Sequence, residues 1–523
     1  MRMISKPAEM VLSASSLVQY KHNLALSAMQ NVSPRGPAVA TRLAAIRRYR
    51  EAWAFSTLQL TAGPLACFIA QHDAQLCRLQ FIPFVGSLIG LLAGSELKLW
   101  CAPSPIRGLE AKTWSWGLRT LALEPQQGVV DLSRGVAVVC GIGTVDPRDP
   151  ECHVLALCSS GNVTHHPMAA RPVLSINAPQ KHVYELALRG DMFSVTFDDA
   201  FTGTVTQLYN WREGMLMKEF TAPSTDWVHH SVLLDDRTLI ISSSNHLRVH
   251  VLDYAGDHSS TVPPTVAPAY ILRLPGDDYS CTTVMQMTCN ESSAAADRAG
   301  LFQPDPDATL LSIRFGVTCN VFHTCHHGTR RWREYFLFIP RLTLLSRLKS
   351  TKPAPAGQST ELQWEEWSDE ASVLLRVRHD AFTADTLLRT SFLGSRFALA
   401  IDSLQEDPPP YVRHIDVYIF DAHLNARPDG PECDRAREHA SRYFNFGPTD
   451  DDSRAGGSCF PAARVSLPYR LLHKEFVSEE RDQRVFFEST RVVMLDDGVA
   501  LLRENNDPVA MQNIVTSCCM FSV

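Results

Sequence analysis

The chain has 523 residues, of which 45% are hydrophobic and 20% charged, and its formal net charge is -7. This length exceeds that of one ordinary compact domain, so we expect several units or a repetitive fold. The acidic balance excludes an extended basic surface of the kind that binds nucleic acid, and we predict no nucleic-acid partner.

Residues 1–54 predict a short helical segment. Residues 15–29 repeat apolar side chains every three to four positions behind Ser15, which is a good N-cap. Residues 41–53 predict a second helix, with Leu43, Ile46, Tyr49, Ala52 and Trp53 on one face. The arginines of this helix are expected mostly on the opposite, solvated face; they are Arg42, Arg47, Arg48 and Arg50.

No stretch of the sequence predicts a leader peptide or a membrane span. The most apolar run, residues 81–94, contains Pro83 and is shorter than the roughly 20 residues that a spanning helix needs. We interpret it as two buried strands joined by a turn. We therefore expect no membrane association and a cytoplasmic or nuclear location.

From residue 55 onward, short alternating runs typical of strands replace the helical periodicity. Residues 186–220 show the repeating unit, in which three apolar runs are separated by polar turns. Similar runs recur at 96–100, 152–157, 206–211, 247–254 and 415–421, and the early ones are roughly 40 to 55 residues apart, the spacing of propeller blades. The fold class is therefore mainly β. We expect a WD-repeat-like β-propeller array of about six or seven antiparallel meanders at residues 55–503, with tandem β-sandwiches as the alternative.

Three polar insertions interrupt the later units of this array. They lie near residues 290–307, 350–360 and 424–458 and are rich in Pro, Gly, Ala, Asp or Ser, so we predict disorder there. Residues 504–523 are assigned to a tail outside the array.

The order of these elements resembles the large F-box protein family of mushroom-forming fungi. Residues 15–29 look like the end of an F-box region and its following helix, and 41–53 look like the family's linker helix. Further matches are residues 99–108, 127–132, 190–214, 338–345, 364–367 and 466–470. The resemblance implies an intracellular substrate receptor of a Skp–cullin–F-box ubiquitin ligase. The opening F-box helix of the family has no counterpart here, so the Skp adaptor is an expected partner only if an F-box lies upstream.

Sequence motifs for catalysis and cofactor binding do not emerge, and we predict no cofactor and no enzyme activity. The best metal-like cluster is Cys319, His323, Cys325 and His327, which offers zinc-type ligands on alternate strand positions. We interpret it as core cysteines and exposed histidines, with a zinc site as the weaker alternative.

Two aromatic and basic groups are candidates for contacts with a protein partner. One is the pair Trp364 and Trp367, for which packing between blades is the commoner use. The other is Arg330, Arg331 and Trp332, which suit an acidic or phosphorylated peptide.

The sequence as a whole predicts a non-catalytic protein-interaction scaffold with an unknown protein target. Two alternatives stay open: a propeller-type enzyme with its site at the central channel, and a decayed copy without activity. The first would require convergent polar residues from several blades.

Overall fold

The computed structural model describes residues 15–32, 36–54, 59–61, 79–82, 88–93, 96–143, 150–157, 163–176, 183–199, 203–221, 230–252, 268–275, 280–289, 300–319, 331–352, 354–355, 358–368, 372–378, 381–382, 386–405, 411–423, 431–447, 463–480, 488–495, 498–507 and 512–522.

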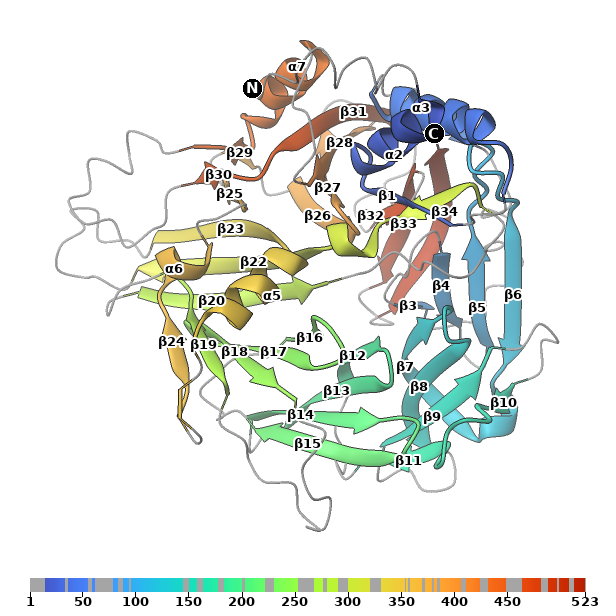
Figure 1. The fold of residues 1–523 in the computed structure, drawn as a ribbon, viewed down its shortest axis with the longest axis vertical. Coiled ribbons are helices and arrows are strands. Elements are labelled where there is room, and N and C mark those ends of the chain that lie inside the picture. The colour runs from blue at the N-terminus through green and yellow to red at the C-terminus, as the bar shows by residue number, and fades with distance from the viewer. Residues whose placement is uncertain are drawn as a thin grey trace.

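Seven antiparallel meander sheets, here called blades 1 to 7, form a ring around a common axis (Figure 1). In each blade the first strand of the antiparallel meander lies innermost. In blade 7 this strand is β32, and β2, which comes earlier in the chain, lies outermost. Neighbouring innermost strands contact each other from blade 1 to blade 5 and from blade 6 to blade 7. Thr390 of blade 6 donates a 3.2 Å hydrogen bond to Gln286 of blade 5, and blade 7 contacts blade 1 through the first strand of blade 1. The fold is therefore a β-propeller, as predicted.

Blades 1 to 3 follow one another along the chain without long insertions between their described strands. Blade 1 consists of β3 (Leu79–Ile82), β4 (Leu88–Ala93), β5 (Glu96–Cys101) and β6 (Lys112–Gly117). The short 3-10 helix η1 (Arg119–Leu121) leads into blade 2. Blade 2 consists of β7 (Leu123–Asp131), β8 (Val136–Gly143) and β9 (Pro150–Ala156). Two short strands, β10 (Thr164–His165) and β11 (Val173–Ser175), both pair with β9. Blade 3 consists of β12 (Val183–Arg189), β13 (Met192–Asp199), β14 (Gly203–Asn210) and β15 (Met215–Thr221).

Blades 4 and 5 carry additional elements. Blade 4 consists of β16 (Ser231–Leu233), β17 (Thr238–Ser243), β18 (His246–Val251) and β19 (Tyr270–Arg273), and β24 (Thr360–Leu362) adds to its outer edge in parallel. Blade 5 consists of β20 (Ser280–Thr288), β22 (Leu310–Cys319), β23 (Arg331–Pro340) and β25 (Val373–Val377). Between β23 and β25 the chain also forms helices α5 (Arg341–Ser350) and α6 (Trp364–Ser368).

Blades 6 and 7 complete the ring. Blade 6 consists of β26 (Thr386–Leu393), β27 (Arg396–Gln405), β28 (Tyr411–Ala422) and β31 (Tyr469–Glu480). Blade 7 consists of β32 (Glu488–Leu495), β33 (Gly498–Asp507), β34 (Gln512–Ser522) and β2 (Gln59–Thr61). The outermost strand of the last blade thus comes from the N-terminal side of blade 1, with Leu60 opposite Phe521. This pairing joins the two ends of the ring.

The expected tail at residues 504–523 is wrong in large part, because strand β34 is the third strand of blade 7. It pairs with β33 over most of its length, from Gln512 opposite Asp507 to Ser522 opposite Gly498. The mixed polar and apolar composition of this stretch did not predict a strand. In the structure β34 pairs with β33 on one side and with β2 on the other.

The described parts of the predicted insertions contain ordered elements, which corrects the expectation of disorder for those residues. Residues 290–299, 353, 356–357, 424–430 and 448–458 lie outside the described residues. Residues 290–307 include β21 (Phe302–Pro304) and most of the 3-10 helix η2 (Pro306–Ala308), and residues 350–360 lead into β24. Residues 424–458 include α7 (Pro431–Ala440) and β29 (Phe444–Asn445), and β29 pairs with β25 together with β30 (Arg464–Val465). Polar composition misled the prediction because these elements are stabilised by distant partners: β24 and β29 extend blades 4 and 5, and β21 pairs with β1 of the N-terminal region.

The two predicted N-terminal helices are present as α2 (Ser16–Ala25) and α3 (Val39–Ala54), with the short strand β1 (Met29–Asn31) between them. The Ser15 hydroxyl accepts a hydrogen bond from the Val18 N–H, as expected of an N-cap. Leu43, Ile46, Tyr49 and Trp53 of α3 are buried, also as expected. Arg42 differs from the prediction: it is buried, donates to Asn31 at 2.7 Å and lies over the Tyr20 ring.

Gly141 in β8 is needed because the neighbouring backbone comes very close. The partner strand β7 shifts register between Pro125 and Gln127, and a Cβ on Gly141 would lie 2.1 Å from the Glu124 carbonyl oxygen. We expect Gly141→Ala to lower the free energy of unfolding by about 1–3 kcal/mol, since a backbone contact cannot rotate away. Gly117→Ala is the matched control, because that Cβ meets nothing within 4 Å. Equal melting temperatures for the two variants would contradict this reading.

Burial of His250 between blades 3 and 4 predicts a dependence of stability on pH. The ring lies 4.3 Å from the Phe220 ring, and desolvation, with Arg248 and Lys218 nearby, lowers its pKa from 6.5 to about 3. Below about pH 6.5 the His250 side chain is protonated in the unfolded chain, whereas in the folded protein it stays neutral down to about pH 3. This group alone therefore makes the unfolding free energy fall by about 2 kcal/mol between about pH 7.5 and about pH 5.

Denaturant unfolding of the protein and of His250→Phe at both pH values measures this contribution. We expect the difference between the two pH values to be smaller for the variant. An exposed histidine provides the control, and His165→Phe should leave the difference unchanged.

Candidate interaction face

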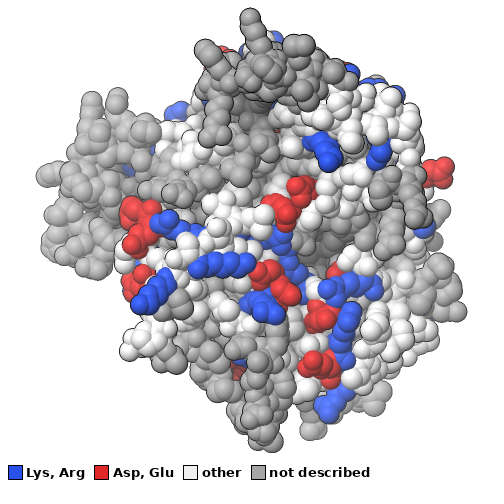
Figure 2. Space-filling view, in the orientation of Figure 1, with Lys and Arg blue, Asp and Glu red and all other residues white. Residues whose placement is uncertain are grey.

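The described turns that follow the innermost strands lie on one face of the ring, the face toward the viewer in Figures 1 and 2. This arrangement follows from topology, because the innermost strands run in the same direction and each is followed by an antiparallel neighbour. The β7–β8 turn brings Arg134 to this face, the β12–β13 turn brings Asp191 and the β16–β17 turn brings Asp235. We call it the turn face.

Among the described residues, basic and acidic side chains alternate over the turn face, without a large area of one sign (Figure 2). Arg134 of blade 2 forms an ion pair with Asp191 of blade 3, and the Nε atom of Arg212 lies 3.0 Å from the same carboxylate. Mixed charge of this kind does not favour a polyanion.

Two further arginines join blades 3, 4 and 5 on this side. Arg189 donates to the Leu233 carbonyl at 2.7 Å, and Arg341 donates to the Leu234 and Pro306 carbonyls, both at 3.1 Å. Burial lowers the pKa of the Arg189 guanidinium, and Arg341 close by contributes in the same direction. These side chains hold the turns together and are structural contacts between blades.

A segment inserted in blade 5, residues 300–309, runs from that blade toward the N-terminal helices, and we call it the crossing segment (yellow-green in Figure 1). Its strand β21 pairs with β1. Arg107, in the connection between β5 and β6 of blade 1, donates from Nε to the Phe302 carbonyl at 3.1 Å. The crossing segment therefore links blade 5 to blade 1 and to the N-terminal region.

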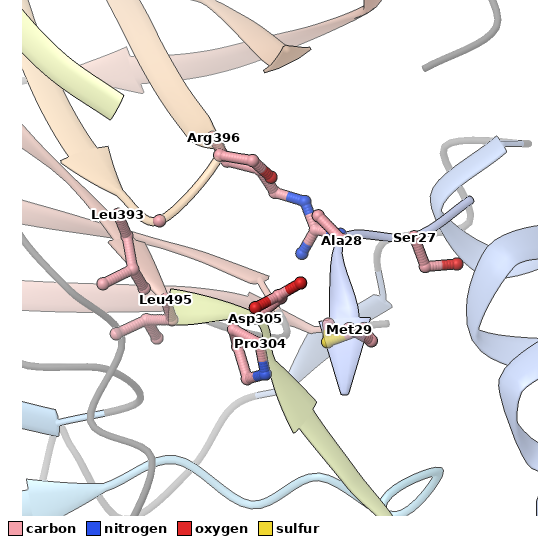
Figure 3. A pocket seen from close by; sticks show the side chains of 10 residues that line it. Ser27, Ala28, Met29, Pro304, Asp305, Leu393, Arg396 and Leu495 are labelled. Carbon is pink, nitrogen blue, oxygen red and sulfur yellow. The ribbon is translucent and has the colours of Figure 1, made fainter. Parts of the chain in front are cut away.

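A small pocket lies where the α2–β1 connection, the crossing segment and the first turns of blades 6 and 7 meet (Figure 3). Its cavity volume is about 10 Å³, far below the range usual for small-molecule sites. The Arg396 guanidinium and the Asp305 carboxylate are directed toward the same space (Figure 3). The lining residues are Ser27, Ala28, Met29, Pro304, Asp305, Leu393, Gly394, Ser395, Arg396 and Leu495.

Arg396 connects this pocket to the N-terminal helices. Its guanidinium donates to the Tyr49 hydroxyl at 2.7 Å and lies 4.4 Å from the centre of the Trp53 ring. Its Nε atom is 3.4 Å from Asp421. Burial alone would raise the pKa of Asp421, but Arg396, His423 and Arg470 together hold it below its ordinary value. The pocket is thus a packed junction whose charged groups already have partners.

Trp364 and Trp367, predicted as possible partner contacts, lie in the core of blades 4 and 5. They are 6% and 4% exposed, their rings meet edge to face at 5.2 Å, and the Trp367 indole donates to the Arg273 carbonyl at 2.8 Å. They offer a partner little surface. The structure therefore corrects the partner-binding prediction in favour of packing, because the helix α6 that carries them turns both rings inward.

Trp332, in contrast, is 40% exposed at the end of blade 5 opposite to the turn face. Its ring lies over Gly316, where an added Cβ would come within 1.8 Å of the indole. Arg331 is the first residue of β23, and Arg330 lies outside the described residues. Of the metal-like cluster, Cys319 ends β22, while His323, Cys325 and His327 lie outside the described residues.

The sequence analysis did not identify one further group of polar residues that could bind a metal ion. Asp416, His439 and His473 converge on the outer part of blade 6 although 57 residues separate the first from the last. No spacing in the sequence signals this cluster, because α7 brings His439 to the sheet from an inserted segment.

Comparison with known proteins leaves the family open. No protein-family model and no curated protein matches the chain. Among solved structures it is similar to the WD40 domain of SCAP from fission yeast, with 8% identity, a TM-score of 0.34 and coverage of 86% of this chain and 95% of that one.

Two other solved structures are similar at the same level. The β-propeller domain of the trilobed protease from Pyrococcus furiosus shows 7% identity, a TM-score of 0.34 and coverage of 86% and 94% of the two chains. Drosophila Semaphorin 1b, extracellular domains 1–2, shows 9% identity, a TM-score of 0.35 and coverage of 85% and 84%. The propeller assignment rests on the sheet order of this chain. In the described part of the chain, no helix combines the length and apolar character needed to cross a membrane.

Loss of the Arg396 guanidinium should loosen the N-terminal helices. We expect Arg396→Leu to lower the unfolding free energy by about 3–5 kcal/mol, because Asp421 would keep a buried charge without its nearest cation. Hydrogen exchange in α3 should accelerate at the same time. Arg48→Leu on the exposed side of α3 is the control and should leave both measurements unchanged. Normal protection of α3 in Arg396→Leu would show that this contact does not hold the helix.

Proposed function

We propose that the protein is a non-catalytic protein-interaction scaffold in which the N-terminal helices and the propeller form one rigid unit. The observation that carries this proposal is the hydrophobic core that they share. Tyr20, Ile46, Tyr49 and Trp53 pack together with residues of blades 6 and 7 such as Val417. A module joined ahead of Ser15 would thus have a fixed direction relative to the blades.

The finer proposal is a substrate receptor of a Skp–cullin–F-box ubiquitin ligase, acting in the cytoplasm or nucleus. The resemblance of residues 15–29 and 41–53 to the post-F-box region of fungal F-box proteins supports it. Rigid coupling suits this role, because transfer of ubiquitin depends on holding a target lysine at a defined place relative to the transferring enzyme.

The adaptor interaction is tested by co-purification of the Skp adaptor with two proteins. One is this chain, and the other is preceded in frame by the residues encoded upstream of Met1. Adaptor binding by either protein supports the ligase role. Binding by neither contradicts the ligase role and leaves the scaffold to be tested on its own.

The target interaction is tested by proximity labelling and pull-down of protein partners from cells. We propose Trp332 as a contact residue, because an exposed tryptophan is the commonest kind of interface anchor. Trp332→Ala should weaken capture of the recovered partner by about 30-fold, equivalent to about 2 kcal/mol. Met168→Ala on blade 2 is the control, since that side chain is 57% exposed. Failure to recover any stable partner would contradict the scaffold proposal.

A further inference from the structure

Three side chains with metal-binding atoms meet on blade 6. One oxygen of Asp416 and one ring nitrogen each of His439 and His473 all lie within 4.8 Å of one another. Asp416 belongs to β28, His473 to β31 and His439 to α7. The β28–β31 register places Asp416 opposite Glu475 and Tyr418 opposite His473, so the strand residues share one face of the sheet.

Helix α7 is held against this face independently of the cluster. Cys433, Ala436 and Ala440 of α7 are buried in the apolar core between blades 5 and 6, together with Tyr418 and Tyr469. This packing fixes the last turn of the helix, so that His439 lies at a defined place above the strands. The position of the third ligand therefore does not depend on a metal.

The distances suit a metal ion after a small adjustment. Nε2 of His473 is 2.7 Å from Oδ1 of Asp416, a direct hydrogen bond. Zinc bonds of about 2.0–2.2 Å at tetrahedral angles separate ligand atoms by about 3.3 Å. A widening of about 0.6 Å would thus admit the ion between them.

A second group positions His439 from outside the cluster. Its Nδ1 atom is 2.7 Å from the Tyr418 hydroxyl, which leaves Nε2 available to a metal. The His439 and His473 rings are stacked, with centroids 4.1 Å apart and planes 20° apart. Metal binding would therefore require one ring to turn, because an imidazole nitrogen binds a metal ion in the plane of its ring. Metal-binding histidines commonly use the other ring nitrogen for such an outer hydrogen bond.

We propose that Asp416, His439 and His473 bind one Zn²⁺ ion, which fastens α7 to strands β28 and β31. Two imidazoles and one carboxylate are a common ligand set for Zn²⁺, with water in the fourth position. The ion would tie three chain segments together within the insertion of blade 6. It would thereby add to the apolar packing that already holds α7 on the blade.

The test uses the full chain, freed of metal with a chelator, and Zn²⁺ as the titrant in calorimetry. We expect one Zn²⁺ per chain, and we expect Asp416→Asn, His439→Gln and His473→Gln each to weaken binding by about 10- to 100-fold. His414→Gln is the matched control: its side chain is on the same strand, 35% exposed and 3.2 Å from Glu475. It should bind Zn²⁺ like the unaltered protein.

A second measurement reports on structure and not on affinity. Hydrogen exchange across α7 should slow when Zn²⁺ is added, and this effect should vanish in His439→Gln. Co²⁺ in place of Zn²⁺ should give the intense visible absorption of a tetrahedral site. Circular dichroism of each variant confirms that weakened binding does not come from unfolding.

Three outcomes would overturn the proposal. The first is that the unaltered protein binds no Zn²⁺, so that the three residues form only a hydrogen-bonded clamp. The second is that all three variants bind as well as the His414→Gln control. The third is that Cys325→Ser with His327→Gln abolishes binding, which would assign the ion to the other cluster.

Discussion

Every blade of this protein must have both faces covered, and the ring is the arrangement that satisfies this constraint. Val138 and Val154 of blade 2 pack against Phe193 and Val195 of blade 3, while Ala137 and Val139 on the other side of the same sheet pack against blade 1. A sheet that is apolar on both sides cannot be stable by itself in water. The closing strand β2 adds a segment from the N-terminal side of blade 1 to β34 of blade 7 and thereby joins the two ends of the ring.

The N-terminal region belongs to this core. The Tyr49 hydroxyl and the Trp53 ring both meet Arg396, which is in turn paired with Asp421 in the neighbouring strand of blade 6. A buried guanidinium is stabilised by a nearby carboxylate and by aromatic rings. The N-terminal helices, the crossing segment and blades 6 and 7 share one hydrophobic core.

Insertions that look like loops protect the outer edges of the blades. Strand β24 covers the free edge of blade 4, and β29 and β30 cover that of blade 5. Exposed strand edges are templates for unwanted pairing between molecules, and covering them disfavours such pairing. Helix α7 comes from the same inserted region as β29. The proposed metal site thus lies in a part of the chain that already stabilises the rim.

The sequence by itself determined the local elements. Period-2 alternation with turn residues predicted the meanders, such as the one at residues 186–220. Helical periodicity behind Ser15 predicted α2, and the apolar face around Tyr49 predicted α3. These features are encoded within about ten neighbouring residues, so one sequence suffices to read them.

Only the tertiary structure decided the closure by β2, the pairing of β1 with β21, the strand β34 and the inward direction of Trp364 and Trp367. It also decided the meeting of Asp416, His439 and His473. Each of these contacts joins segments that are far apart in the chain or placed by a docked insertion. Local propensity and periodicity do not carry that information, because it arises from which surfaces remain to be buried once the blades have formed.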